Sequence, residues 1–329
     1  MLAFTNPQAR VLGIDVSQAA LQHQHRLKQR YGLDNLALEH RSITTCASLD
    51  REFDLIVSTG VLHHLDDPTS ALRLLGDRLK PDGCMGLMLY ARYGRFGVEM
   101  LQQLFRELNL QANAEDLAVI RSCLTHTDPD HPLRSYQSVA DDLDQPAGLV
   151  DTFLPKRERS YTVEDCLNLV AAAGLQFQDW LFKTPYYPPS PRQPGDPFLA
   201  TIATLPIAQQ WGVMERLHTR NACHVFMVCR PERTLPVLNF ECAEARHVVP
   251  ALRRPFHLDG NQLHRNGQPV PLSAKTQALI QAINGHQSIA EICQTWPQID
   301  PNTIVQQLAE LWRLDVIAIT LPAARRQRI

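Results

Sequence analysis

Apolar segments of strand length alternate with helical patterns over the first third of the chain. Four such segments occur, at residues 11–15, 36–43, 53–59 and 84–91. Ser17 can cap a helix that Gly32 ends, and Asp67-Pro68 starts a second helix before the fourth segment. The nearly continuous apolar run at 53–59 predicts a central strand buried on both faces. This pattern predicts an α/β fold with a doubly wound, mostly parallel sheet and right-handed crossovers.

The first of these segments ends in a carboxylate, Asp15. In an open parallel sheet the ligand lies outside the carboxyl ends of the strands, where an acid can accept both ribose hydroxyls of an adenine cofactor. Alternatively, Asp15 is a turn residue that caps the next helix. No glycine-rich turn from a strand into a helix precedes it. We therefore expect half of a nucleotide-type site here, and the other half upstream of Met1.

Length and composition indicate two domains. A chain of 329 residues exceeds the size at which a single core usually suffices. With 44% hydrophobic and 20% charged residues, it can bury a large core. We place a larger domain at 1–235 and a smaller one at 236–329. The formal net charge is -2 and only the short tail 325–328 is basic, so the composition does not indicate a nucleic acid partner.

The chain shows no feature of an exported or membrane protein. Its eight cysteines are scattered without CxxC pairs, so we expect reduced thiols and no zinc site. It has no export signal, and no apolar run approaches the roughly 20 residues that span a bilayer. We expect a soluble, cytoplasmic protein without a membrane partner.

Four motifs in a fixed order resemble the class I S-adenosylmethionine-dependent methyltransferases, in particular bacterial methyltransferase-domain proteins. They are VLGIDVS, FDLIVSTGVLHHLDDP, LRLLGDRLKPDG and GCMGLMLYA. The resemblance covers about the first 100 residues well and the chain to about 235 loosely. It implies a Rossmann-like sheet that here lacks its first strand, S-adenosyl-L-methionine as cofactor, and methyl transfer to a small-molecule or protein acceptor.

The resemblance also implies a set of cofactor-binding residues. Asp15 would bind the ribose and Val16 would lie against the adenine, at the end of the first strand. Ser42 and Ile43 follow the second strand, where such enzymes often carry an aspartate and an apolar residue for the adenine. Thr59, Gly60 and Val61 match the segment that passes beneath the methionine moiety.

Two groups of residues are candidates for the chemistry. His63 and His64 follow the predicted central strand, and an imidazole there can act as a general base. The alternative is that the pair packs and hydrogen-bonds locally. The substrate-binding candidates are two tyrosines and two arginines that follow the fourth strand: Tyr90, Arg92, Tyr93 and Arg95. The alternative is that these arginines are solvated and that the tyrosines cover the end of the sheet.

Residues 97–160 predict a helical insertion, which in the resembled family forms a lid over the substrate. His131, Tyr136 and Asp151 are candidates for lining it, with turns and solvated faces as the alternative. The His and Asp spacings match no metal motif. Segments 175–182 and 222–229 predict two antiparallel strands at the edge of the sheet.

The last hundred residues predict a winged-helix-like domain of three helices followed by a strand at 316–320. The helix at 302–313 would be the recognition helix for DNA, yet it contains a single arginine. We therefore expect this domain to serve protein interaction or oligomerisation.

The missing glycine-rich turn leaves two explanations. One is a lost N-terminal part, for example through a start codon assigned too far downstream, which we favour because Asp15 and the Gly60 segment are intact. The other is a degenerate, non-catalytic methyltransferase-like protein with an interaction or regulatory role. A nicotinamide-dependent oxidoreductase also uses an acid after its second strand, but GVLHH and the antiparallel edge suit a methyltransferase better. On either explanation, the chain as printed is expected to bind S-adenosylmethionine poorly.

Overall fold

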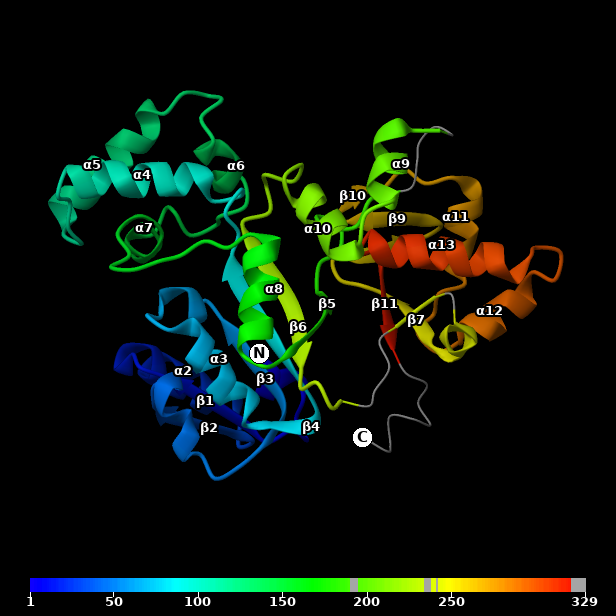
Figure 1. Ribbon diagram of the computed structural model, residues 1–329, viewed down its shortest axis with the longest axis horizontal. Helices are drawn as coiled ribbons and strands as arrows, with labels where there is room; N and C mark the ends of the chain where they lie inside the picture. The colour runs from blue at the N-terminus through cyan, green and yellow to red at the C-terminus, as the bar shows by residue number, and fades with distance from the viewer. Residues whose placement is uncertain (190–194, 234–237, 241, 321–329) are drawn as a thin grey trace.

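The structure is a computed structural model that describes residues 1–189, 195–233, 238–240 and 242–320. Figure 1 shows a central sheet, a group of helices beyond the end of β4, and a separate C-terminal group of helices and short strands. The predicted domain boundary at 235/236 and the basic tail at 325–328 lie outside the described residues.

The N-terminal sheet consists of two hydrogen-bonded parts. In the first part, β1 (Val11–Asp15) pairs in parallel with β2 (Leu36–His40). In the second, β3 (Phe53–Thr59) pairs in parallel with β4 (Leu79–Tyr90), β4 is antiparallel to β6 (Cys223–Cys229), and β6 is antiparallel to β5 (Gln176–Trp180). Both predicted edge strands are therefore present and antiparallel. The strand order in the second part is β3-β4-β6-β5.

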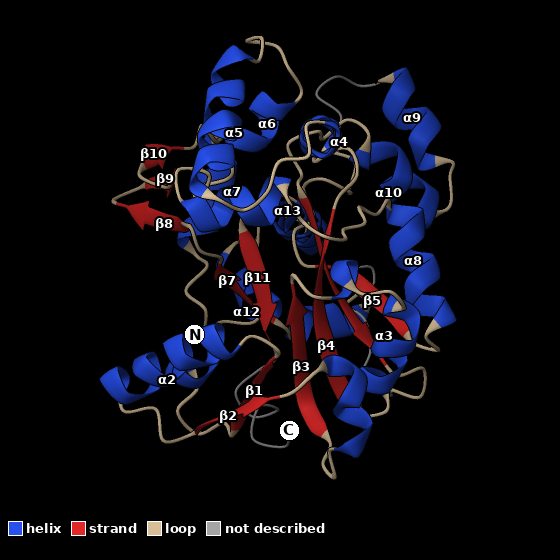
Figure 2. Cartoon of the chain, turned by 90° about the vertical axis from the view of Figure 1, so that its left-hand side faces the viewer, coloured by secondary structure: helices blue, strands red, loops and turns tan. Residues whose placement is uncertain are grey.

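The β1–β2 pair lies beside β3 in both views (Figures 1 and 2), but within the described ranges no strand is hydrogen-bonded to the second edge of β1 or of β3. Leu55 and Val57, which lie on one face of β3, are 46% and 48% exposed. The prediction that 53–59 is buried on both faces is therefore wrong. An apolar run gives a strand in either case, and its burial depends on the neighbours that it finds.

The predicted helix boundaries at Ser17, Gly32 and Asp67 are confirmed. Ser17 caps α2 (Gln18–Tyr31) by accepting from Ala20 N, and Gly32 ends it at a φ of 59°. Asp67 caps α3 (Pro68–Gly76) by accepting from Ser70 N. Thr162 and Asp165 form a complete capping box at α8 (Val163–Ala172), so the short aspartate side chain suffices at this position.

The predicted insertion is helical. It contains α4 (Phe96–Glu107), α5 (Ala114–His126), α6 (Leu133–Gln137) and α7 (Pro146–Phe153). These helices share a core of their own, which includes Val98, Phe105, Ile120 and Leu149. Figure 1 shows them together on one side of the molecule, at the end to which β4 leads.

The remaining elements complete the fold. A short α1 (Leu2–Thr5) precedes β1, 3-10 turns η1 (Ile43–Ser48) and η2 (Leu62–His64) follow β2 and β3, and α9 (Pro197–Ala203) and α10 (Ile207–Glu215) precede β6. None of the helices in the described part of the chain has both the length and the apolar character needed to cross a membrane.

The C-terminal domain has the predicted three helices and closing strand. These are α11 (Ala274–Gln281), α12 (Ile289–Thr295), α13 (Pro301–Arg313) and β11 (Ile317–Thr320). A 3-10 turn, η3 (Ala243–His247), precedes β7 (Val249–Leu252), which pairs antiparallel with β11. The short strands β8 (Phe256–Asp259), β9 (Gln262–Arg265) and β10 (Gln268–Pro269) form a separate antiparallel sheet.

Asp315 joins the C-terminal domain to the N-terminal domain. Its Oδ2 accepts hydrogen bonds from the Lys183 and Thr184 backbone N–H groups at 2.8 and 3.0 Å. Its Oδ1 accepts from Arg253 at 2.8 Å. The Lys183 ammonium also lies 4.3 Å from the centre of the Trp312 ring. The charged groups at this junction are therefore paired, which fixes α13 against the loop after β5.

A buried polar network lies where β6, α8 and α10 meet. His224 Nε2 donates to Tyr161 O at 2.9 Å, and its Nδ1 accepts from the Tyr186 hydroxyl at 2.7 Å. Burial lowers the pKa of His224 to about 4, so its ring is neutral near pH 7. Glu215 accepts from Val163 N, and burial raises the pKa of its carboxyl to about 7.

The raised pKa of Glu215 makes stability depend on pH. Below about pH 4.5 this carboxyl is neutral in both the folded and the unfolded chain; as pH rises through about 7 the folded protein must ionise a buried acid. The free energy of unfolding lost in this way amounts to about 3 kcal/mol at most. We predict that Glu215→Gln, which keeps an acceptor for Val163 N, gains stability relative to the parent between pH 5.5 and pH 8 in urea unfolding. An equal difference between the two proteins at both pH values would contradict the assignment.

Candidate functional site

Asp15 is the last residue of β1, as predicted, and it is half-buried. Its Oδ1 accepts a hydrogen bond from Ser17 N at 2.7 Å. The carboxylate therefore does support the turn into α2, which was the alternative interpretation. This bond uses only one of the two carboxylate oxygens. The ribose-binding role of Asp15 stays a prediction.

The predicted adenine-binding residues lie at the ends of β1 and β2. Val16 is exposed directly after Asp15, and His40 at the end of β2 is hydrogen-bonded to its carbonyl oxygen at 2.9 Å. Ser42 caps η1 by accepting from Thr44 N, and Ile43 begins that turn and packs on the main core. Ser42 is thus engaged locally, and Val16 offers an uncovered apolar surface.

The segment after β3 contains a glycine in the left-handed conformation. Gly60 has a φ of 71°, in the left-handed region that favours glycine, while Thr59 and Val61 on either side are exposed. A turn of this kind lets the chain leave the strand sharply and expose its backbone at the carboxyl edge of the sheet.

The two histidines have different environments. His63 is 1% exposed, its ring stacks on Tyr90 at 3.9 Å, and neither ring nitrogen has a hydrogen-bond partner. Burial, with smaller effects of His64 and Arg95, lowers the pKa of His63 to about 3, which makes it a weak base. His64 Nδ1 instead donates to Arg157 O at 2.9 Å. In its neutral form this leaves the His64 Nε2 lone pair available, so His64 suits proton removal better than His63.

A column of stacked and paired groups connects His63 to the helical insertion. The Arg95 guanidinium lies 3.7 Å from the centre of the Tyr90 ring, on which His63 also packs. Arg95 then donates to Glu158 Oε1 at 2.8 Å and to the Tyr136 hydroxyl at 3.1 Å. Arg95 is completely buried, so the prediction of a solvated or substrate-facing guanidinium on a loop is wrong. The carboxylate supplied by the insertion explains how the charge can be buried.

The other two candidates after β4, Arg92 and Tyr93, lie in different surroundings. Arg92 is exposed and lies in the wall of a cavity. Tyr93 is half-buried, and its ring lies 5.6 Å from the Arg216 guanidinium carbon. Arg92 is therefore placed to meet a ligand, whereas Tyr93 packs against the segment after α10.

The cavity beside Arg92 has a volume of about 470 Å³. One wall is α4 and the other is the segment 158–160; the lining residues are Arg92, Phe96, Glu99, Gln102, Arg106, Glu158, Arg159 and Ser160. This segment adjoins the histidines and the end of β4, because Arg159 N donates to His63 O and Tyr161 N donates to Tyr90 O. The cavity thus lies between the carboxyl end of the sheet and the helical insertion.

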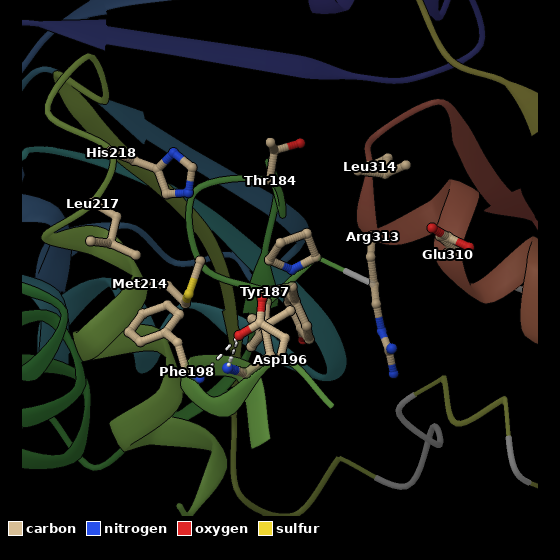
Figure 3. A pocket seen from close by; sticks show the side chains of 13 residues that line it. Thr184, Tyr187, Asp196, Phe198, Met214, Leu217, His218, Glu310, Arg313 and Leu314 are labelled. Atoms are coloured by element: carbon tan, nitrogen blue, oxygen red, sulfur yellow. Dashed lines mark hydrogen bonds between the residues drawn. The ribbon is translucent and has the colours of Figure 1, made fainter. Parts of the chain in front are cut away.

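A second cavity, of about 350 Å³, lies between the two domains and contains none of the predicted site residues. Figure 3 shows its walls: Met214, Leu217 and His218 come from the end of α10 and the residues after it, and Arg313 extends from α13 on the opposite side.

Sequence reasoning missed Glu158 and Gln102. Glu158 stands in the charged run Lys156-Arg157-Glu158-Arg159, which is typical of a solvated loop. Gln102 donates to Glu158 Oε1 at 3.0 Å and to Thr152 O at 2.7 Å. The only signal was that Gln102 falls on the apolar face of α4, beside Val98 and Phe105. Tyr136, a predicted lid residue, does contact this group.

Fold and site together define the class. An α/β sheet ending in Asp15 and in the left-handed Gly60, with a helical insertion after β4 and two antiparallel edge strands, is the class I methyltransferase-like architecture. The predicted fold class is confirmed.

Comparison with known proteins supports the same class. Residues 1–85 match the family model described as a methyltransferase domain, a family whose cofactor is S-adenosylmethionine. The solved structure of PKMT2 from Rickettsia typhi superposes with a TM-score of 0.68 over 96% of this chain and 67% of that chain, at 12% identity. PKMT2 in complex with AdoHcy gives a TM-score of 0.65 over 97% and 68%, at 14% identity. These likenesses show the shared fold, including the C-terminal domain.

A sequence relative is an uncharacterized protein from Synechococcus sp. It is 28% identical over 182 residues, which are 54% of this chain and 44% of that protein. The match therefore spans less than half the length of this curated relative.

The Arg95–Glu158 pair should be essential for stability. We predict that Arg95→Met lowers the free energy of unfolding by about 3–5 kcal/mol, because it leaves the buried Glu158 carboxylate without its charge partner. The exposed Lys80–Asp54 pair provides the control, and Lys80→Met should change stability by about 1 kcal/mol or less. Chemical denaturation of both variants measures the difference, and equal effects would refute a buried role for Arg95.

Proposed function

We propose that the chain is an S-adenosylmethionine-dependent methyltransferase whose acceptor lies in the cavity between α4 and residues 158–160, called the α4 cavity below. The main support is the position of Asp15 at the carboxyl end of β1, within the segment that matches the methyltransferase domain family. Gly60 at the end of β3 and the Arg92 cavity beyond β4 lie along the same edge of the sheet.

The residues present fit part of the cofactor. Asp15 keeps one carboxylate oxygen beyond its bond to Ser17 N, Val16 is uncovered, and Gly60 has a left-handed conformation. We assign the ribose hydroxyls to Asp15, the adenine face to Val16 and Ile43, and the methionine moiety to the turn at 59–61.

S-adenosylmethionine, when bound, supplies an electrophilic methyl group on a sulfonium. Transfer of that group is an in-line displacement, so the protein contributes mainly orientation and exclusion of water. We assign proton removal from the acceptor to His64, whose orientation is fixed by its bond to Arg157 O. His63 holds Tyr90 and Arg95 in place instead.

A second candidate is a non-catalytic methyltransferase-like protein with an interaction role. Two observations favour it. Leu55 and Val57 of β3 are exposed, and within the described residues no strand is hydrogen-bonded to both β1 and β3. This alternative predicts that no cofactor binds, whatever the chain length.

Calorimetric titration with S-adenosylmethionine distinguishes the two. We predict weak binding to this chain, and a loss of about tenfold or more in affinity for Asp15→Asn, because the neutral amide loses charge-assisted bonds to the ribose. Asp54→Asn at the opposite end of β3 is the matched control and should leave the affinity unchanged.

The absence of binding, with folding of the chain confirmed, would remove the enzymatic function.

A further inference from the structure

Two residues that line the α4 cavity, Glu158 and Ser160, each have a side-chain oxygen without a hydrogen-bond partner. Glu158 Oε2 and Ser160 Oγ are both buried and make no hydrogen bond. The Glu158 side chain is only 4% exposed, and its Oε1 already accepts from Arg95 and Gln102. Buried polar atoms are normally paired, so Glu158 Oε2 points to a ligand that offers a hydrogen-bond donor, while the Ser160 hydroxyl can donate or accept.

The rim of the same cavity is basic. Arg92, Arg106 and Arg159 contribute three guanidiniums to the lining, against Glu99 at the rim and Glu158 at the floor. Arg159 is partly compensated by Asp165, at 3.2 Å. Since Arg95 lies directly behind Glu158, the surroundings as a whole carry an excess of positive charge. An anionic group is therefore attracted to the rim.

These two features together restrict the ligand. A simple cation would pair with Glu158 but would meet the basic rim, and a simple anion would leave Glu158 Oε2 unpaired. A molecule with both an ammonium and an acidic group satisfies both ends. Phe96, which is 54% exposed, adds an aromatic surface to the wall.

We infer that this cavity binds a small zwitterion of the amino-acid type, with its ammonium toward Glu158 and Ser160 and its acidic group among Arg92, Arg106 and Arg159. That the zwitterion is the methyl acceptor rests on the proposed function. That the cavity binds a zwitterion does not depend on the cofactor.

Three matched probes test the two charges separately. L-phenylalanine has both charges and a ring for Phe96, N-acetyl-L-phenylalanine lacks the ammonium, and L-phenylalaninamide lacks the acid. Ligand-observed NMR titrations of the full chain, without S-adenosylmethionine, should show phenylalanine binding at least about fivefold more tightly than either analogue.

Variants connect each charge to its residue. Arg92→Gln should weaken phenylalanine binding by about fivefold and leave phenylalaninamide unchanged, because the amide has no acid for Arg92 to bind. Glu158→Gln should weaken phenylalanine binding and leave N-acetylphenylalanine unchanged. Ser160→Ala repeats the test of the floor without disturbing the Arg95 pair. Arg26→Gln, on the exposed surface of α2, is the control and should change nothing.

Equal binding of the three probes, no binding of phenylalanine, or an unchanged affinity in both Arg92→Gln and Ser160→Ala would overturn the inference. Its failure is distinguishable from failure of the proposed function. Binding of phenylalanine without binding of S-adenosylmethionine sinks the methyltransferase proposal alone, and the reverse result sinks the zwitterion site alone.

Discussion

The buried ion pair between Arg95 and Glu158 is the interaction on which the site depends. Arg95 follows β4 and Glu158 follows the helical insertion, so their bond ties the insertion to the carboxyl end of the sheet. The same guanidinium packs on Tyr90, which in turn orders His63. Because a buried charge must remain paired, the geometry of the cavity wall follows from this one contact.

That pairing also explains how one cavity can have a free carboxylate oxygen and a basic rim. Arg95 and Gln102 both bind Glu158 Oε1, which fixes the carboxylate and leaves Oε2 without a hydrogen-bond partner. The arginines of the rim lie on α4 and on the segments that flank it, so the fold brings their charges together.

Much of the fold could be predicted because its signals are local. Ser17, Gly32 and Asp67 begin or end helices through bonds within a few residues of themselves, and the apolar runs become strands within a few residues of the predicted limits. The positions of Asp15 and Gly60 at strand ends follow from the same signals. Each depends on a short stretch of sequence and on no distant partner.

The rest depends on contacts between distant residues. Arg95 and Glu158 are 63 positions apart, and nothing near either one indicates that the other will neutralise it. The exposure of Leu55 and Val57 likewise depends on what covers that face of β3, which the apolar run itself does not reveal. Burial and charge pairing were therefore the features that sequence patterns could not give.

The central claim is that the ends of β1 and β3 hold the cofactor while the α4 cavity holds the acceptor. A crystal structure of this chain with S-adenosylhomocysteine at saturating concentration tests it most directly. We predict ribose hydroxyls within hydrogen-bond distance of Asp15 and a homocysteine chain over Gly60, with the α4 cavity left free. Density for the nucleoside in the α4 cavity or between the two domains would contradict the account.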